Sequence, residues 1–431
     1  MKKVLKRVLM IIGVLVVLLA GLFGYYKLCM DPYRGTVDAF ANSVSMDEML
    51  SGEEAKEDLK FLIEHLQERH PAWLEESEEL VAAVEAQYEQ EVNEIGEEIS
   101  VMELDKAAAR ITARLHDGHT YVAWKNDEEA RYIDDFTQLW TYGKPIAIDG
   151  IPTEEVVGIY METASYEREE YANRQFFGRI IVSEHGLCLS GIDTSDGVTM
   201  TFENNGEIVE YSYKFVPIEE VNGYTQSTEE SKWVSYEIDE ENSVGIFTLT
   251  ACICDKEYEQ TLDEFFQNVF DAGIQNVVVD LRGNGGGNSW VANEFITYLD
   301  VEKYRSWDCA IRYGWYLDKN EDIEYTNQKK KQVFDGNVYV LTDIWTYSAA
   351  MDFAMLIADN DMGVIIGEAS GNLPDSYGDC LYFQMPNSKL AVSISYKRWY
   401  RIDQTKSGEP IMPDYETSSD EALQKVYELI P

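Results

Sequence analysis

The sequence predicts an α/β fold, preceded by a membrane-spanning segment and a helical region. From about residue 233 onward, strand patterns alternate with helix patterns, which is typical of βαβ units around a largely parallel sheet. The chain has 431 residues, 45% of them hydrophobic, so it can bury more than one core. An uncharged run near the N-terminus is long enough to cross a bilayer.

The first 45 residues predict a membrane anchor. Residues 1–7 are basic and form a short cytoplasmic tail, residues 8–26 carry no charge, and residues 27–45 follow as a tether. The positive-inside rule places the acidic body outside the cytoplasm. A cleaved signal peptide is the alternative, but the uncharged run is long for one and no small-residue cleavage site follows it. Lipid attachment at Cys29 is disfavoured by the bulky residues that precede it.

Residues 46–129 form a helical region. Their apolar residues recur at intervals of three and four, and a capping box formed by Ser100 and Glu103 begins the second helix. We expect this helix to stop at Gly118, with His119 directly after it at the start of a short strand.

Residues 130–232 predict a small β-rich module. A helix is expected over Thr153–Met161. The turn Asn204-Asn-Gly206 separates strand patterns over 198–202 and 208–215, which predicts a hairpin.

Residues 233–431 carry the alternating pattern of the expected α/β core. Strands are expected over 244–250, 276–281, 337–341 and 363–367, helices over 258–270, 289–299 and 348–357, and a hairpin over 381–384 and 390–395. The valine-rich strand at 276–281 is typical of a strand buried on both faces.

Composition argues against two kinds of site. The formal net charge is −44, and five basic residues lie within residues 1–27, so the remainder carries −49. Such a field repels phosphate backbones, and we expect no nucleic-acid partner. The six cysteines lack the spacing of a metal site, and we expect buried thiols with room for one disulfide.

A glycine-rich segment, Asp280–Gly287, follows the valine-rich strand. Glycines let backbone N–H groups converge on an anion, either a phosphate or the oxyanion of an acyl-transfer intermediate. The segment fits neither the phosphate-loop motif nor the dinucleotide fingerprint. A tight structural turn is the alternative interpretation.

Ser348 opens an expected helix directly after a strand and a short turn. The helix dipole and the next amide can stabilise negative charge there, although a simple N-cap is the alternative. A serine nucleophile needs a base. Of the five histidines, His116 and His119 share one turn, and His119, after Gly118, has more freedom to face a cleft. Metal binding by this H-x-x-H pair lacks a third ligand at recognisable spacing.

Four motifs together carry a family resemblance. In chain order they are Asp117-Gly-His-Thr120, Asp280-Leu-Arg-Gly-Asn-Gly-Gly-Gly287, Thr346-Tyr-Ser-Ala-Ala350 and Gly367-Glu-Ala-Ser-Gly371. This set resembles the tail-specific and tricorn-core family of serine peptidases, over about residues 50–420. The resemblance implies a crotonase-like α/β core, often with a PDZ-like module that presents the substrate's C-terminus. Residues 130–232 could be that module.

The resemblance also implies roles for single residues. Ser348 matches the nucleophile, and Gly285, Gly286 and the amide of Ala349 match the oxyanion donors. Tail-specific members use a lysine base about two dozen residues after the serine, in a Gly-Lys-Gly context. This chain has asparagine there, in Gly371-Asn372-Leu373.

With that lysine missing, His119 resembles the base of the histidine-containing, tricorn-like branch. The resemblance implies a supporting acid late in the chain, for which Asp403 and Glu409 are candidates. Asp352 stands where many members have Glu, and Ser370 where threonine is common.

The sequence thus predicts a membrane-anchored extracytoplasmic serine endopeptidase that uses Ser348 and His119, with no metal or cofactor implied. Its expected partners are a peptide or protein substrate and, through the N-terminal helix, the membrane. Two alternatives remain open: a noncatalytic ligand- or peptide-binding member of the same fold, and a hydrolase of a non-peptide ester or amide.

Overall fold

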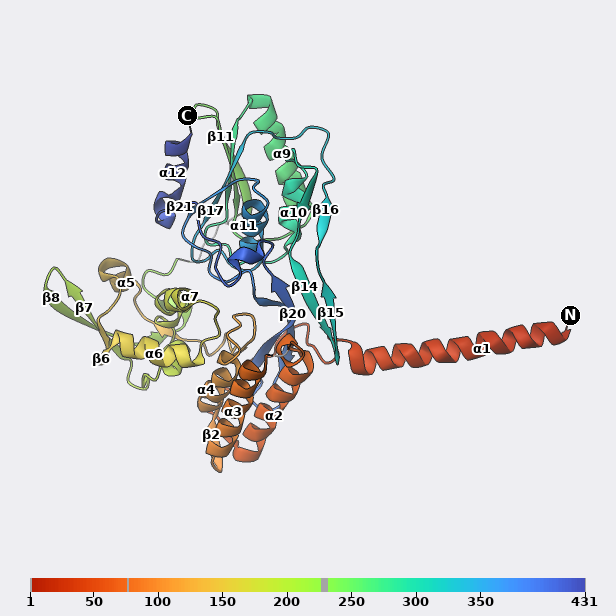
Figure 1. Cartoon of the computed structure of the whole chain (residues 1–431). Coiled ribbons are helices and arrows are strands. Elements are labelled where there is room, and N and C mark those ends of the chain that lie inside the picture. Colours follow the sequence, from red (N-terminus) through yellow and green to blue (C-terminus); the bar gives the residue numbers. More distant parts are fainter. Residues whose placement is uncertain (1, 76, 226–231, 431) are drawn as a thin grey trace.

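The computed structural model describes residues 2–75, 77–225 and 232–430. A long apolar helix, α1 (Lys2–Tyr25), continues into a π-helical turn over Tyr26–Met30 and projects away from the rest of the chain (Figure 1). None of its membrane-length window is buried against other parts of the protein. One apolar helix of this length is compatible with a membrane span or with a signal sequence.

The C-terminal part is built on a six-stranded sheet of order β10-β11-β12-β17-β18-β21. The strands from β11 to β21 are parallel, and β10 is antiparallel to β11. Their bounds are β10 Val234–Asp239, β11 Val244–Leu249, β12 Asn276–Asp280, β17 Asn337–Thr342, β18 Val364–Gly367 and β21 Tyr415–Glu416.

Helices cover both faces of this sheet, which explains why its central strands are apolar throughout. In β12, Val277 and Val279 pack with the helices of one face and Val278 with α12 on the other. The helices are α9 (Lys256–Ala272), α10 (Trp290–Ile296), α11 (Ala349–Asp359) and α12 (Ala422–Leu429).

A second, antiparallel sheet joins the core to the N-terminal helices. Its order is β15-β14-β20-β19, and β3 also pairs with β20. Leu59, Leu62 and Leu66 of α2 are fully buried in the cluster that covers this sheet. The elements are β3 (Tyr121–Ala123), β14 (Asp308–Tyr313), β15 (Tyr316–Asn320), β19 (Tyr377–Gln384), β20 (Ala391–Tyr400), α2 (Gly52–Arg69), α3 (Glu78–Glu94) and α4 (Val101–Ala113). The pairing of β3 with β20 holds His119 beside the core.

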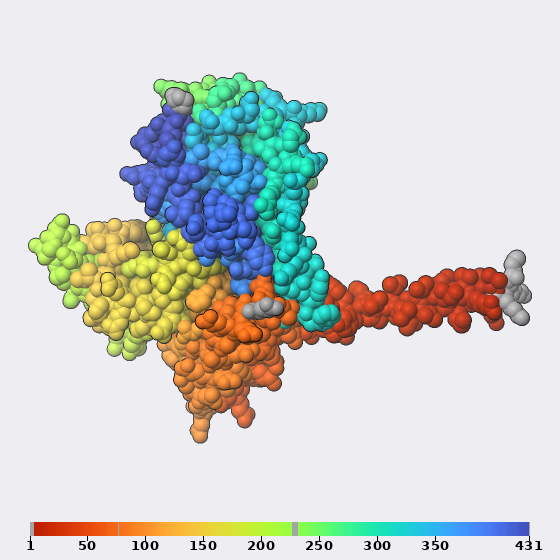
Figure 2. Space-filling model, in the orientation of Figure 1, coloured from red at the N-terminus to blue at the C-terminus, as the bar shows by residue number. Residues whose placement is uncertain are grey.

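The middle module, residues 132–216, surrounds a third hydrophobic cluster. It contains an antiparallel sheet of order β6-β5-β7-β8 and a pair β4-β9. In Figure 2 it lies against the C-terminal core. Its elements are β4 (Tyr132–Ile133), α5 (Thr137–Tyr142), β5 (Ala147–Ile148), β6 (Ile151–Pro152), α6 (Thr153–Thr163), α7 (Glu169–Gln175), α8 (Glu184–Leu189), β7 (Val198–Asn204), β8 (Glu207–Tyr213) and β9 (Phe215–Val216).

The sheet and helix order predicted for the core is confirmed, and so is the hairpin β7–β8. Its turn residues Asn205 and Gly206 both have positive φ, at 53° and 85°, as the Asn-Gly pattern predicts. The short pairs β1–β2 (Met49–Ser51 with Glu98–Ser100) and β13–β16 (Lys303–Arg305 with Glu324–Thr326) complete the strands.

Three expectations need correction. The helix that begins after Ser100 ends at Ala113, before the predicted stop at Gly118. The tether is bonded to the body, since the Val37 N–H donates to the Tyr382 carbonyl at 2.9 Å. The six cysteines are all unpaired, and Cys29 is exposed rather than buried.

Candidate active site

A cavity of about 850 Å³ lies where the C-terminal core, the β3 segment and the middle module meet. The core contributes Gly285 and Ser348, and the segment before β3 contributes His119. Walls from the middle module include Tyr160, Tyr171, Gln175, Arg179 and His185. All three parts of the body therefore contribute residues to the lining of this cavity.

Ser348 stands on a strained turn between β17 and α11. Its φ is 52°, a conformation that costs a non-glycine residue about 1–3 kcal/mol. The surroundings hold it there: the Ser348 N–H donates to Asn372 Oδ1 at 2.8 Å, and Thr346 Oγ1 donates to the Leu281 carbonyl at 2.9 Å. Asn372, at the place of the missing lysine, thus fixes the backbone of Ser348.

His119 faces this serine, with Nε2 3.1 Å from Ser348 Oγ. The β3–β20 pairing holds the segment in place, and the His119 carbonyl accepts from Ser393 Oγ at 2.7 Å. For Nε2 to accept the hydroxyl proton, the ring proton must be on Nδ1. The structure therefore brings together two predicted residues that lie 229 positions apart.

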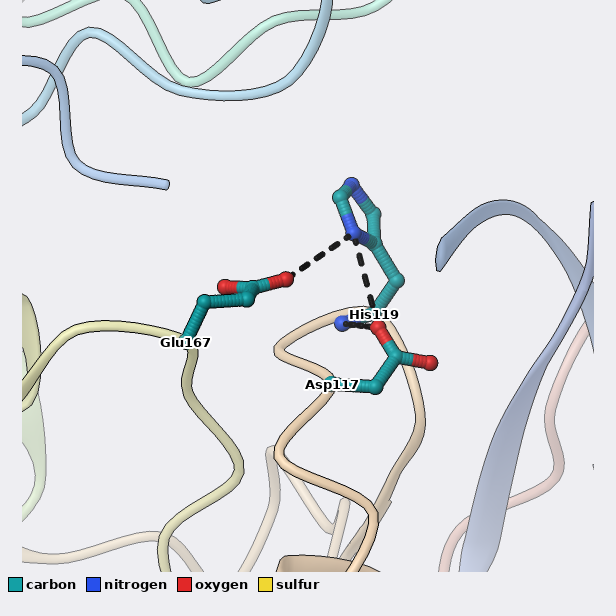
Figure 3. A group of neighbouring side chains, drawn as sticks. All are labelled: Asp117, His119 and Glu167. Carbon is teal, nitrogen blue, oxygen red and sulfur yellow. Dashed lines mark hydrogen bonds and ion pairs between the residues drawn. The ribbon is translucent and has the colours of Figure 1, made fainter. Parts of the chain in front are cut away.

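Two carboxylates stand beside Nδ1 of His119 (Figure 3). Asp117 Oδ1 is 3.8 Å and Glu167 Oε1 is 4.0 Å from that nitrogen. Nδ1 is buried and has no hydrogen-bond partner among the described residues. A small closing movement of either acid would supply one, because the usual limit is near 3.2 Å.

Asp117 is held as an ionised, fully buried carboxylate. His70 Nδ1 accepts the Ala72 N–H, so its Nε2 carries the proton and donates to Asp117 Oδ2 at 3.2 Å. Ser395 Oγ donates to the same oxygen at 2.7 Å. Burial alone would raise the pKa of Asp117, but the hydrogen bond from His70 and the further stabilisation by His119 and Thr120 outweigh it, and the pKa is lowered.

Glu167 comes from the middle module, in the segment between α6 and α7. Its side chain is only 4% exposed. Tyr347 Oη donates to Oε2 at 2.8 Å and the Gly118 N–H donates to Oε1 at 3.2 Å. Burial raises the pKa of this carboxyl above its usual range, although these two hydrogen bonds act in the opposite direction.

The two late acids proposed from the sequence have other contacts. Asp403 Oδ1 accepts from Thr405, and Lys406 forms an ion pair with Oδ2. The Glu409 carbonyl accepts from Arg401. Asp117 was part of a motif that the sequence displays, whereas nothing near Glu167 in the sequence indicates a catalytic role.

The glycine-rich segment packs directly against the nucleophile. A Cβ at Gly286, where φ is 101°, would lie 2.7 Å from Ser348 Cβ, so this position requires glycine. The Gly286 N–H donates to Asn284 Oδ1 at 2.8 Å and is engaged in this conformation. Within the described ranges, the Gly285 and Ala349 amides make no hydrogen bond. They are the free donors of the predicted set.

Asp117, His119 and Glu167 also have the composition of a metal site, since one donor atom from each lies within 4.8 Å of the others. In the arrangement described, Asp117 Oδ1 accepts the His119 N–H and Glu167 Oε1 accepts the Gly118 N–H. The two carboxylates thus already serve to position the histidine and its loop.

Asp352, one turn after Ser348 in α11, has an unusual ionisation. Burial raises its pKa to about 7, although a hydrogen bond from Ser289 Oγ, 2.9 Å from Oδ2, favours the charged form. Because the folded-state pKa lies above the unfolded one, the folded protein becomes less stable as the pH rises from about 4 to about 7, and the penalty persists above that.

Asp352→Asn should therefore raise the Tm clearly near pH 8 and little near pH 4. A shift of this size corresponds to at most about 4 kcal/mol, which the partial exposure of the side chain reduces. We expect a gain of several degrees, measured by calorimetry at both pH values. The same gain at pH 4 and pH 8 would contradict a buried ionisation.

Comparison with known proteins identifies a related family and related folds. Residues 243–417 match the model of Peptidase family S41. The crystal structure of mature CPAF is 13% identical, with a TM-score of 0.60 over 88% of this chain and 95% of that chain. The structure of mature CPAF in complex with lactacystin is also 13% identical, with a TM-score of 0.58 over 88% of this chain and 96% of that chain. A structure from Parabacteroides merdae, described as a peptidase, is 12% identical, with a TM-score of 0.50 over 88% of this chain and 97% of that chain.

At these identities the solved structures show a shared fold. The family match covers most of the expected catalytic core, 233–431, and includes the glycine-rich segment and Ser348. The resemblance expected from the motifs is confirmed: residues 243–417 match peptidase family S41, and this match identifies the part of the chain that carries Ser348 as a serine peptidase domain.

Proposed function

We propose that this protein is a membrane-anchored, extracytoplasmic endopeptidase in which Ser348 attacks a peptide carbonyl and His119 is the base. The observation that carries the proposal is the 3.1 Å approach of Ser348 Oγ to His119 Nε2 at the edge of a large cavity. A hydroxyl is a weak nucleophile until a neighbouring base accepts its proton, and this pair meets that need.

The reaction follows from the groups around the serine. His119 Nε2 takes the hydroxyl proton as Oγ bonds to the carbonyl carbon, and the amides of Gly285 and Ala349 donate to the oxyanion. The imidazolium then gives its proton to the leaving amine, and water hydrolyses the acyl-enzyme by the same steps. Asp117 and Glu167 stabilise the positive charge that His119 carries in between.

Glu167 is a positioning residue in this scheme, because it acts through His119. Glu167→Gln should lower kcat/KM about ten- to hundred-fold with little change in KM, since Asp117 remains. Because the pKa of Glu167 is raised, this carboxylate is protonated at a higher pH than an ordinary glutamate. Wild-type activity should therefore begin to fall at that higher pH as the solution is acidified. The variant's pH–rate profile should lack that step.

Glu169→Gln, an exposed neighbour in α7, is the matched control and should leave the profile unchanged. An unchanged acid limb in Glu167→Gln would exclude Glu167 from the mechanism.

In this proposal the middle module acts as a substrate-presenting, PDZ-like unit on a crotonase-like core. Its aromatic and polar side chains line the same cavity as Ser348, which supports that role. The acidic body favours neutral or basic peptides, and the N-terminal helix holds the protein at the outer face of the membrane.

The full chain, incorporated in lipid nanodiscs, should be incubated with a diverse peptide library and the products read by mass spectrometry. Cleavage by the wild type that is lost in both Ser348→Ala and His119→Ala supports the proposal. A chelator in a parallel sample should have no effect, because no step uses a metal. Cleavage that survives either substitution would overturn the proposal, because the reaction would then use another residue in place of the substituted one. No cleavage by the wild type would overturn it in favour of a binding role.

A further inference from the structure

The tip of the β14–β15 hairpin lies against the end of the N-terminal helix (Figure 1). Trp315 Nε1 donates to Tyr25 Oη at 2.7 Å, which joins the hairpin to the last turn of α1. Gly314, at φ 55°, packs so closely on the Cys29 carbonyl that a Cβ there would collide with it. The hairpin tip and the base of the anchor therefore form one structural unit.

This unit exposes an unusual number of large apolar and aromatic side chains. Trp315 is 67% exposed and Tyr316 48%, although both belong to a well-paired hairpin. Their exposed neighbours on the chain that leaves α1 are Tyr25, Tyr26, Leu28 and Tyr33. Tryptophan and tyrosine gather at membrane–water interfaces because their rings are apolar and their N–H or O–H groups remain hydrated.

The charges here differ from those of the rest of the body. A cavity of about 600 Å³ under the hairpin is lined by three arginines, Arg34, Arg69 and Arg312, and by two glutamates, Glu64 and Glu68. Glu68 forms ion pairs with Arg34 and Arg69. Arg312 is buried and donates to the carbonyls of Gly314, His70 and Gln67, and within the described ranges it has no carboxylate partner. In a body of net charge −49, the lining of this cavity has one more basic than acidic residue, so this end of the body repels anionic lipid headgroups less than the rest does.

We infer that the β14–β15 tip is a second membrane contact, with Trp315 and Tyr316 in the headgroup region of the leaflet from which α1 emerges. The inference rests on the proposed membrane anchorage and is independent of catalysis. A bilayer that surrounds α1 up to Tyr25 must reach Trp315, because the two side chains are hydrogen-bonded. Two contacts fix the orientation of the body on the membrane, whereas the helix α1 alone would leave the body free to tilt.

Photo-crosslinking tests this inference on the full chain in phosphatidylcholine nanodiscs. p-Benzoylphenylalanine is introduced in separate variants at Trp315, at Leu15 in the middle of α1, and at Trp140 in α5. Trp140 is the matched control, because it is also 67% exposed but belongs to the middle module. Lipid adducts are quantified by mass spectrometry after irradiation.

We expect lipid adducts at positions 15 and 315, with the yield at 315 at least several-fold above that at 140. Adducts at 15 with only the Trp140 level at 315 would overturn the hairpin contact and leave the anchor intact. The absence of lipid adducts at position 15 would overturn both the hairpin contact and the membrane anchor. The same variants should be assayed for cleavage, since retained activity shows that the body is folded and separates this result from the peptidase proposal.

Discussion

Ser348→Ala should reduce peptide cleavage by a factor of about 10³ or more, to the limit of detection. The substitution removes the one atom that bonds to the substrate carbonyl. It leaves the backbone contacts of the turn in place, including the hydrogen bond from the Ser348 N–H to Asn372. KM, measured on any residual activity, should change little. The measurement is kcat/KM on the best peptide found in the library.

Ser243→Ala is the matched control for this variant. Ser243 is also a serine with positive φ, at 55°, but it lies in the turn between β10 and β11. It should retain wild-type cleavage, although it loses the hydrogen bond from the Gln275 N–H. Cleavage by Ser348→Ala within ten-fold of the wild type would refute Ser348 as the nucleophile.

His119→Ala should have an effect of similar size, also about 10³-fold, because the hydroxyl then has no base. The space left by the imidazole opens onto the cavity, since His119 is one of its lining residues. Added imidazole should therefore restore part of the activity, and the restoration should increase with the concentration of neutral imidazole. A variant that had merely lost its fold would not respond to imidazole.

His116→Asn is the control that separates the two neighbouring histidines. His116 has φ 48° and packs against Tyr166, and asparagine tolerates this backbone conformation. Full activity in His116→Asn, together with imidazole rescue of His119→Ala, is the expected pattern. The reverse pattern would assign the base to His116.

The parts of the fold that the sequence predicts well are those with local signals. Val277 to Val279 identify a strand buried on both faces, and the Asn-Gly turn identifies the β7–β8 hairpin. Ser348 and the glycine-rich segment lie at the ends of such strands, so their place in the site follows from the pattern of alternation. Parallel neighbours end at the same edge of a sheet.

The features that the sequence does not reveal depend on distant contacts. Glu167 lies beside His119 only because the middle module packs against the core, and no local sequence pattern indicates that docking. The strands β14 and β15 have no clear alternation of buried and exposed residues, so no period of two identifies them in the sequence. The late acids Asp403 and Glu409 were expected by resemblance, whereas in this chain the acids beside His119 precede the serine in the sequence.

The residues of the candidate site come from parts of the chain with separate hydrophobic clusters: Ser348 from the core, His119 from the segment between α4 and β3, and Glu167 from the middle module. Partial unfolding that only separates these parts would leave each cluster, and nearly all helix and strand, intact. It would nevertheless draw Glu167 away from His119 and remove one wall of the cavity. We therefore expect heat inactivation to depend on the docking of these parts and to precede global melting, and we expect a substitution that strengthens one cluster alone to leave the working temperature unchanged.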